Sequence, residues 1–140
     1  SLHDALPICK ALGKFCEWIE AQGGDARIAE NTDLFKKASI TKEIYASKDG
    51  YITHMNAEKI GGICVDLGGG RKKKDDIIDH SAGIILAKKT GDSVKKGDVI
   101  ATVHTNDEKS LNGAILDFES AVTIEETAPQ RKPLIYDVVG

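Results

Sequence analysis

The sequence is poor in cysteine, proline and aromatic residues, and it has no long apolar run. It contains 3 cysteines, 3 prolines and 5% aromatic side chains. The three cysteines, Cys9, Cys16 and Cys64, cannot all pair and show no C-x-x-C spacing. This argues against a disulfide scaffold and a zinc site, and it favours a reducing, cytoplasmic setting. The longest apolar cluster, residues 82–87, is strand-sized and far below the ~20 residues of a membrane-spanning helix, so we expect no membrane partner.

The charge balance excludes another class of partner. The 140 residues carry 19 basic and 22 acidic side chains, a net charge of −3, which is too neutral for a protein that binds nucleic acid by neutralising phosphates. A content of 41% hydrophobic and 29% charged residues is typical of a globular chain. The length fits one domain, or one small domain with part of another.

The first eight residues do not fit the rest of the chain. Residues 1–8 include Pro7 and lack the basic, apolar and small-residue order of a signal peptide. They resemble a translated sequencing adapter, so we predict a non-native leader; the alternative is an ordinary disordered terminus.

Apolar residues at helical spacing predict a helix over residues 9–22, ended by Gly23-Gly24, after which Asp25 can act as a cap. We expect extended segments at residues 40–46 and 51–54, joined into a hairpin by an Asp49-Gly50 turn.

A second helix is predicted after Asn56, its natural cap, with Gly68-Gly69-Gly70 as its end. Gly61 and Gly62 lie inside this helix at a cost of about 1 kcal/mol each against alanine, so we expect close packing against that face.

The second half is predicted to be rich in strands. Residues 83–88 and 99–104 form two of them, separated by two Gly-Asp turns that flank a buried Val94. Helical spacing returns from residue 111 to 122, and residues 121–125 and 134–139 are predicted as closing strands. The fold class is α+β, with a helical segment at residues 9–43 and a mixed module at residues 44–140.

No group of residues assembles an active site. The run from Gly68 to Lys74 suggests a phosphate loop, but its glycines follow a helix instead of preceding one, so we favour a helix end with a solvated basic turn. Asp75, Asp76 and Asp79 are best explained by turn formation and surface charge. The four histidines, His3, His54, His80 and His104, lack metal-ligand spacing. His104 falls on a predicted strand and is expected to be half-buried.

Lys109 is the one residue with a competing functional interpretation. Residues 90–103 resemble the biotinyl and lipoyl carrier domains, in which a hairpin soon afterwards presents a modified lysine. Here Asp107-Glu108-Lys109 places the lysine one residue late, and helical spacing begins at Leu111 where a carrier needs further strands. We expect this chain to share the hairpin geometry of the carrier domains but not their carrier function.

The landmarks taken together resemble the C-terminal end of the pyrimidine-nucleoside phosphorylase and thymidine phosphorylase family. The resemblance covers residues 9–139 and rests on five motifs in order: A-Q-G-G-D at 21–25, I-G at 60–61, L-G-G-G-R at 67–71, I-D through G-I at 78–84, and K-T-G-D with V-K-K-G at 89–97. Gly69 stands where the family has alanine.

This resemblance implies an enzyme of nucleoside salvage, a pentosyltransferase in which phosphate attacks a pyrimidine nucleoside and releases the base and a pentose 1-phosphate. It implies an α/β-hammerhead module, similar to a barrel-sandwich fold, after the end of an α/β domain. The family's phosphate and base ligands, its monovalent-cation site and its homodimer contact lie upstream, so no catalytic, substrate-binding or metal residue is assigned here. The module would support domain closure, with a possible interdomain contact through Gly68, Gly69, Gly70 and Arg71. A carrier module using Lys109 and a free-standing binding domain remain the alternatives.

Overall fold

The chain divides into two compact units between Lys37 and Ala38. The computed structural model describes the backbone of residues 2–130 and the side chains of residues 10–130. The expected limit at residue 44 falls inside the first strand of the second unit, which begins at Ile40.

The first unit is built from one long helix and two short ones. Helix α1 spans Leu2–Ala21. As predicted, Gly23 and Gly24 follow its end, and Gly23 has a φ of 76°. The N–H groups of Gly23 and Gly24 donate to the carbonyls of Glu20 and Ile19, both at 2.9 Å. The 3-10 helices η1 (Ala26–Ala29) and η2 (Thr32–Leu34) follow, capped by the side chains of Asp25 and Asn31.

Helix α1 begins earlier than residue 9, so most of the predicted leader is helical. That residues 1–8 are non-native stays a prediction.

The described residues of the second unit form two antiparallel three-stranded sheets. The first has the order β1-β5-β3 and the second β4-β2-β6. Their bounds are Ile40–Tyr45 for β1, Val99–Thr105 for β5, Gly83–Leu86 for β3, Ser93–Val94 for β4, Gly50–Met55 for β2 and Val122–Glu125 for β6. The predicted strands at residues 83–88, 99–104 and 121–125 are confirmed, whereas the one at 134–139 lies outside the described residues.

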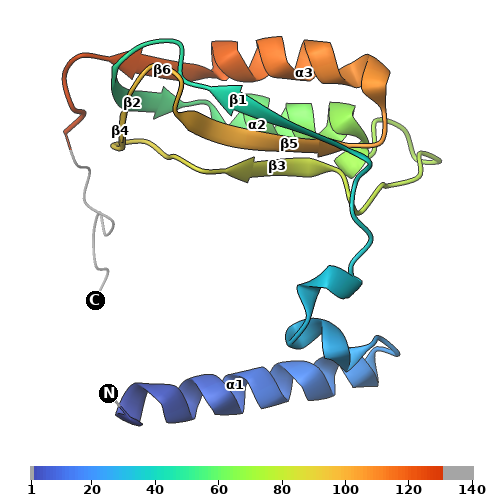
Figure 1. Ribbon diagram of the computed structural model, residues 1–140. Coiled ribbons are helices and arrows are strands. Elements are labelled where there is room, and N and C mark those ends of the chain that lie inside the picture. Colours follow the sequence, from blue (N-terminus) through green and yellow to red (C-terminus); the bar gives the residue numbers. More distant parts are fainter. Residues whose placement is uncertain (1, 131–140) are drawn as a thin grey trace, which may run out of the picture. The chain divides into compact units, whose positions relative to one another are not determined.

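Two helices lie on one side of the first sheet (Figure 1). Helix α2 spans Ala57–Cys64 and continues into a π-helical turn, η3, at Val65–Gly69. As predicted, the Asn56 side chain caps α2 by accepting the Lys59 N–H at 3.0 Å. Helix α3 spans Glu108–Ala121 and is capped by Asp107. Within the described residues, no helix is both long enough and apolar enough to cross a membrane.

The predicted hairpin between residues 40–46 and 51–54 is wrong, because β1 and β2 belong to different sheets. Each strand is held by one of the two Gly-Asp turns. Ala46 exchanges backbone hydrogen bonds with the turn at Gly97-Asp98, and Ile52 does so with the turn at Gly91-Asp92. Gly50 serves a different need: a Cβ there would overlap the carbonyl oxygen of Glu125 in β6.

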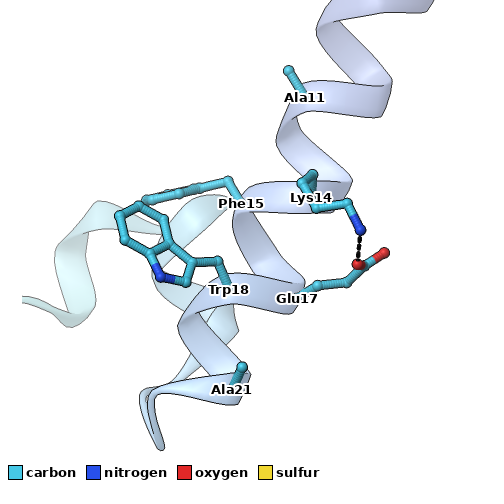
Figure 2. A pocket seen from close by; sticks show the side chains of 6 residues that line it. All are labelled: Ala11, Lys14, Phe15, Glu17, Trp18 and Ala21. Carbon is cyan, nitrogen blue, oxygen red and sulfur yellow. Dashed lines mark hydrogen bonds and ion pairs between the residues drawn. The ribbon is translucent and has the colours of Figure 1, made fainter.

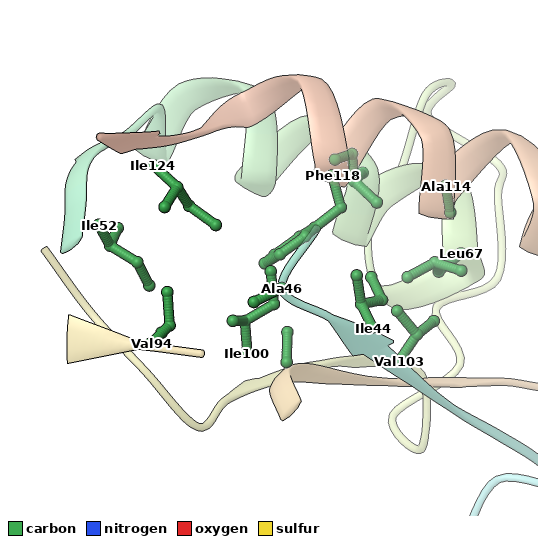
Figure 3. Close-up of a cluster of buried hydrophobic side chains, with 12 residues drawn as sticks. Ile44, Ala46, Ile52, Leu67, Val94, Ile100, Val103, Ala114, Phe118 and Ile124 are labelled. Carbon is green, nitrogen blue, oxygen red and sulfur yellow. The ribbon is translucent and has the colours of Figure 1, made fainter. Parts of the chain in front are cut away.

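The core lies between the sheets and the helices (Figure 3). Phe118 of α3 is 0% exposed, and Ile44 of β1 and Ile52 of β2 are at 2% and 0%. Val94 is buried, as predicted, with an exposed fraction of 4%. The main core residues are Ile44, Ala46, Ile52, Ile63, Leu67, Val94, Ile100, Ala101, Val103, Ala114, Phe118 and Ile124.

The expectation of close packing at Gly61 and Gly62 is also wrong. Both glycines are exposed, and a Cβ on either would meet open space. Ile60 and Ile63 supply the side of α2 that meets the core, so the glycines between them face solvent.

Candidate functional site

The glycine turn, residues 68–71, is fixed by close packing. Gly68 has a φ of 103°, a conformation that strongly favours glycine. A Cβ on Gly69 would lie 3.0 Å from the carbonyl oxygens of both Ala82 and Cys64, and a Cβ on Gly70 would lie 2.7 Å from a methyl group of Val65. Arg71 is exposed. The turn therefore presents an exposed guanidinium group from a closely packed backbone.

Two carboxylates contact the start of the basic run after this turn, through the side chain of Lys72 and the backbone of Lys72 and Lys73. Lys72 Nζ forms an ion pair with Asp66 at 2.5 Å, and this contact raises the pKa of Lys72 above its ordinary value. The backbone N–H groups of Lys72 and Lys73 donate to Asp76 Oδ2 at 3.0 and 2.9 Å. The glycines follow helix α2 and η3, and the lysines after them are exposed, which is the helix end with a solvated basic turn that the sequence predicted.

The acidic residues of the following loop are used in turn formation, as predicted. Asp76 accepts the two amides just described. Asp79 Oδ1 accepts from the N–H and the hydroxyl of Ser81 at 3.0 and 2.7 Å. Asp75 is exposed.

The histidines whose side chains are described form no metal-binding cluster with other ligand residues. Among the residues whose side chains are described, no three His, Cys, Asp or Glu groups are placed to hold a metal ion. His104 is half-buried on β5, as predicted, with Nδ1 3.4 Å from the hydroxyl of Thr41. The side chain of His3 lies outside the described part.

Lys109 lies in the first turn of α3 and is exposed. Its backbone N–H donates to Asp107 Oδ1 at 3.0 Å, the capping contact of that helix. The lysine is thus carried by a helix, whereas the carrier domains that residues 90–103 resemble present theirs on a β-hairpin.

A polar junction joins three segments that the sequence analysis did not connect. Asn106, at the end of β5, contacts Ser39, Asp79 and Ser81 through hydrogen bonds of 2.6 to 2.9 Å. Asn106 and Ser39 are 67 residues apart in the chain, so no local pattern could have revealed this contact.

The described residues line several shallow surface depressions. One lies along α1 and is lined by Ala11, Lys14, Phe15, Glu17, Trp18 and Ala21 (Figure 2). Its aromatic residues are largely exposed, with Phe15 at 44% and Trp18 at 63%. A second lies between β1 and β6, where Tyr45 donates to Glu43 at 2.6 Å and has a raised pKa through that contact.

The comparisons with known proteins agree on one family. The profile of the pyrimidine nucleoside phosphorylase C-terminal domain matches residues 51–125. A pyrimidine-nucleoside phosphorylase of Staphylococcus epidermidis is 38% identical over 138 residues, which is 99% of this chain and 31% of the relative. A thymidine phosphorylase of Colwellia psychrerythraea is 39% identical over 127 residues, 90% of this chain and 29% of the relative.

A third relative, a pyrimidine-nucleoside phosphorylase of Geobacillus stearothermophilus, is 34% identical over 139 residues and is matched over 32% of its length. The chain thus spans about a third of the length of these relatives. The match to the domain profile covers more than half of the chain. The chain belongs to the pyrimidine nucleoside phosphorylase family, whose C-terminal domain it carries.

Proposed function

We propose that this chain is the C-terminal part of an enzyme that transfers the pentosyl group of a pyrimidine nucleoside to phosphate. A phosphate oxygen bonds to the anomeric carbon as the bond from that carbon to the base breaks. The base leaves with a proton, and the other product is a pentose 1-phosphate. The observation that supports this most strongly is the similarity to phosphorylases over 99% of the chain.

The chain itself acts as a non-catalytic module of that enzyme. Catalysis of this transfer depends on oriented contacts to phosphate and base. In the described part of the chain, Asp76 and Asp79 are engaged in turns. Lys72 is paired with Asp66. The nucleoside, the phosphate and a monovalent cation would all be held by the part of the enzyme upstream of this chain, which would also form the homodimer contact.

The role of the module is to support closure of the enzyme over its substrates. The glycine turn is proposed as its contact with the opposing domain, because Gly68, Gly69 and Gly70 hold the backbone in one conformation and Arg71 is exposed. We assign the enzyme to the cytoplasm, with no nucleic-acid or membrane partner.

The test is phosphorolysis by the purified 140-residue chain. It is incubated with thymidine or uridine and phosphate, and free base is measured chromatographically, with the Geobacillus relative as positive control. We expect no phosphate-dependent base release above a blank. Release that requires phosphate and scales with the chain's concentration would show that the catalytic residues lie within it.

A further inference from the structure

The side-chain amide of Asn106 uses all of its hydrogen-bonding capacity. Its Oδ1 accepts from the N–H and the hydroxyl of Ser39, both at 2.7 Å. Its Nδ2 donates to Asp79 Oδ2 at 2.6 Å and to the Ser81 hydroxyl at 2.9 Å. An asparagine amide has two donor hydrogens and an oxygen with two lone pairs, so every position is filled. Such a group is fixed in orientation by its partners.

Ser39 lies at the entrance of the second unit. The unit begins at Ala38, and the ladder between β1 and β5 begins where Ile40 pairs with Thr105. Ser39 and Asn106 lie immediately outside these two strands, next to this pair. The Asn106 side chain therefore accepts the backbone N–H of Ser39 just beyond the end of the ladder.

The junction continues from Asp79 to the glycine turn. The backbone N–H of Asp79 donates to the carbonyl of Gly68 at 2.9 Å. A second contact supports the same region, since the Thr105 hydroxyl donates to the Leu67 carbonyl at 3.0 Å. Hydrogen bonds thus run without interruption from Ser39 through Asn106 and Asp79 to Gly68.

We infer that Asn106 is a positioning residue that fixes the point where the chain enters the C-terminal unit and couples that point to the glycine turn. A displacement at the glycine turn reaches Ser39 through Asp79 and Asn106. That such a displacement would accompany closure of the enzyme rests on the proposed function, but the anchoring of Ser39 by Asn106 does not.

Contiguity alone does not demonstrate coupling, so the test measures it. Amide exchange is followed by NMR in the 140-residue chain and in Asn106→Ala. We expect the Ser39 amide to exchange about tenfold faster in the variant, equivalent to ~1.4 kcal/mol. The Asp79 amide should also exchange faster, while amides of the β3–β5 ladder change less.

Asn56→Ala is the matched control, because Asn56 also accepts a backbone N–H through Oδ1, at 3.0 Å from Lys59. It should leave the Ser39 amide unchanged. Ser39→Ala, at an exposed position, is the second variant and guards against misfolding of the first. It removes one hydrogen bond to Asn106 and should still raise exchange at Asp79.

Equal exchange of Ser39 in the parent and in Asn106→Ala would overturn the anchor. An unchanged Asp79 amide in both variants would overturn the coupling, and uniform acceleration of all amides would show a merely structural role. None of these readouts requires substrate, so they are independent of whether the enzyme is a phosphorylase.

Discussion

Replacing Phe118 by alanine should destabilise the second unit severely while leaving the first unit intact. Phe118 is 0% exposed and is the largest fully buried side chain among the described residues. It extends from α3 into the cluster that includes Ile44 and Ala46 (Figure 3). Truncating a buried phenylalanine to alanine costs roughly 3–5 kcal/mol, a large fraction of the ~5–15 kcal/mol that stabilises a typical domain. For a unit of this size the Tm should fall by at least about 12 °C.

The chain offers separate probes for its two units. Trp18 is its single tryptophan and lies in α1, so tryptophan fluorescence reports on the first unit. Circular dichroism of the strands, or the NMR signals of β5, reports on the second. Phe118→Ala should shift only the unfolding transition of the second unit. Leu116→Ala is the control on the same helix, because Leu116 is 66% exposed and its removal should cost no more than about 0.5 kcal/mol.

Removing residues 1–37 should leave the Tm of the second unit nearly unchanged, because that unit has its own core. A loss below about 1 kcal/mol in Phe118→Ala would refute the packing argument. Parallel shifts of the tryptophan and strand signals, or collapse of the second unit on deletion, would show that the two units unfold as one domain.

Four further predictions concern single residues. Gly50→Ala should destabilise the second unit, because its Cβ would overlap the β6 backbone, whereas Gly61→Ala in the open face of α2 should stabilise it by up to ~1 kcal/mol in urea unfolding. Lys109 should stay unmodified on co-expression with lipoyl or biotin ligases; a mass increase that disappears in Lys109→Arg would restore the carrier interpretation. The pKa of Asp25 is held below its ordinary value by hydrogen bonds from Arg27, so its NMR titration midpoint should rise in Arg27→Leu. Because that pKa is lowered on folding, the small stabilisation is present above the unfolded pKa and is lost as the pH falls through the folded one; an unchanged midpoint in the variant would contradict the assignment.

Local chemistry accounts for what the sequence predicted correctly. Gly23, Asp25 and Asn56 act on backbone groups within five residues of themselves, so their roles can be inferred from short patterns. The same holds for the helix end at Gly68, where the positive φ requires glycine.

Long-range pairing accounts for what the sequence did not predict. Asp49-Gly50 has the composition of a hairpin turn, yet β1 pairs with β5 and β2 pairs with β4 and β6. Partner choice in a sheet depends on burial across the whole module, which no window of neighbouring residues contains. The junction at Asn106 was missed for the same reason.

The proposed function makes this chain the C-terminal part of a phosphorylase and places the catalytic residues in the region of the relatives that the chain does not span. The most direct measurement fuses the part of the Geobacillus relative that precedes the matched region to this chain and assays phosphate-dependent base release. The relative cut at the same point, without the fused chain, is the control. We predict that the fusion releases base from a pyrimidine nucleoside well above the truncated relative. A correctly folded fusion no more active than the truncated relative would contradict the account.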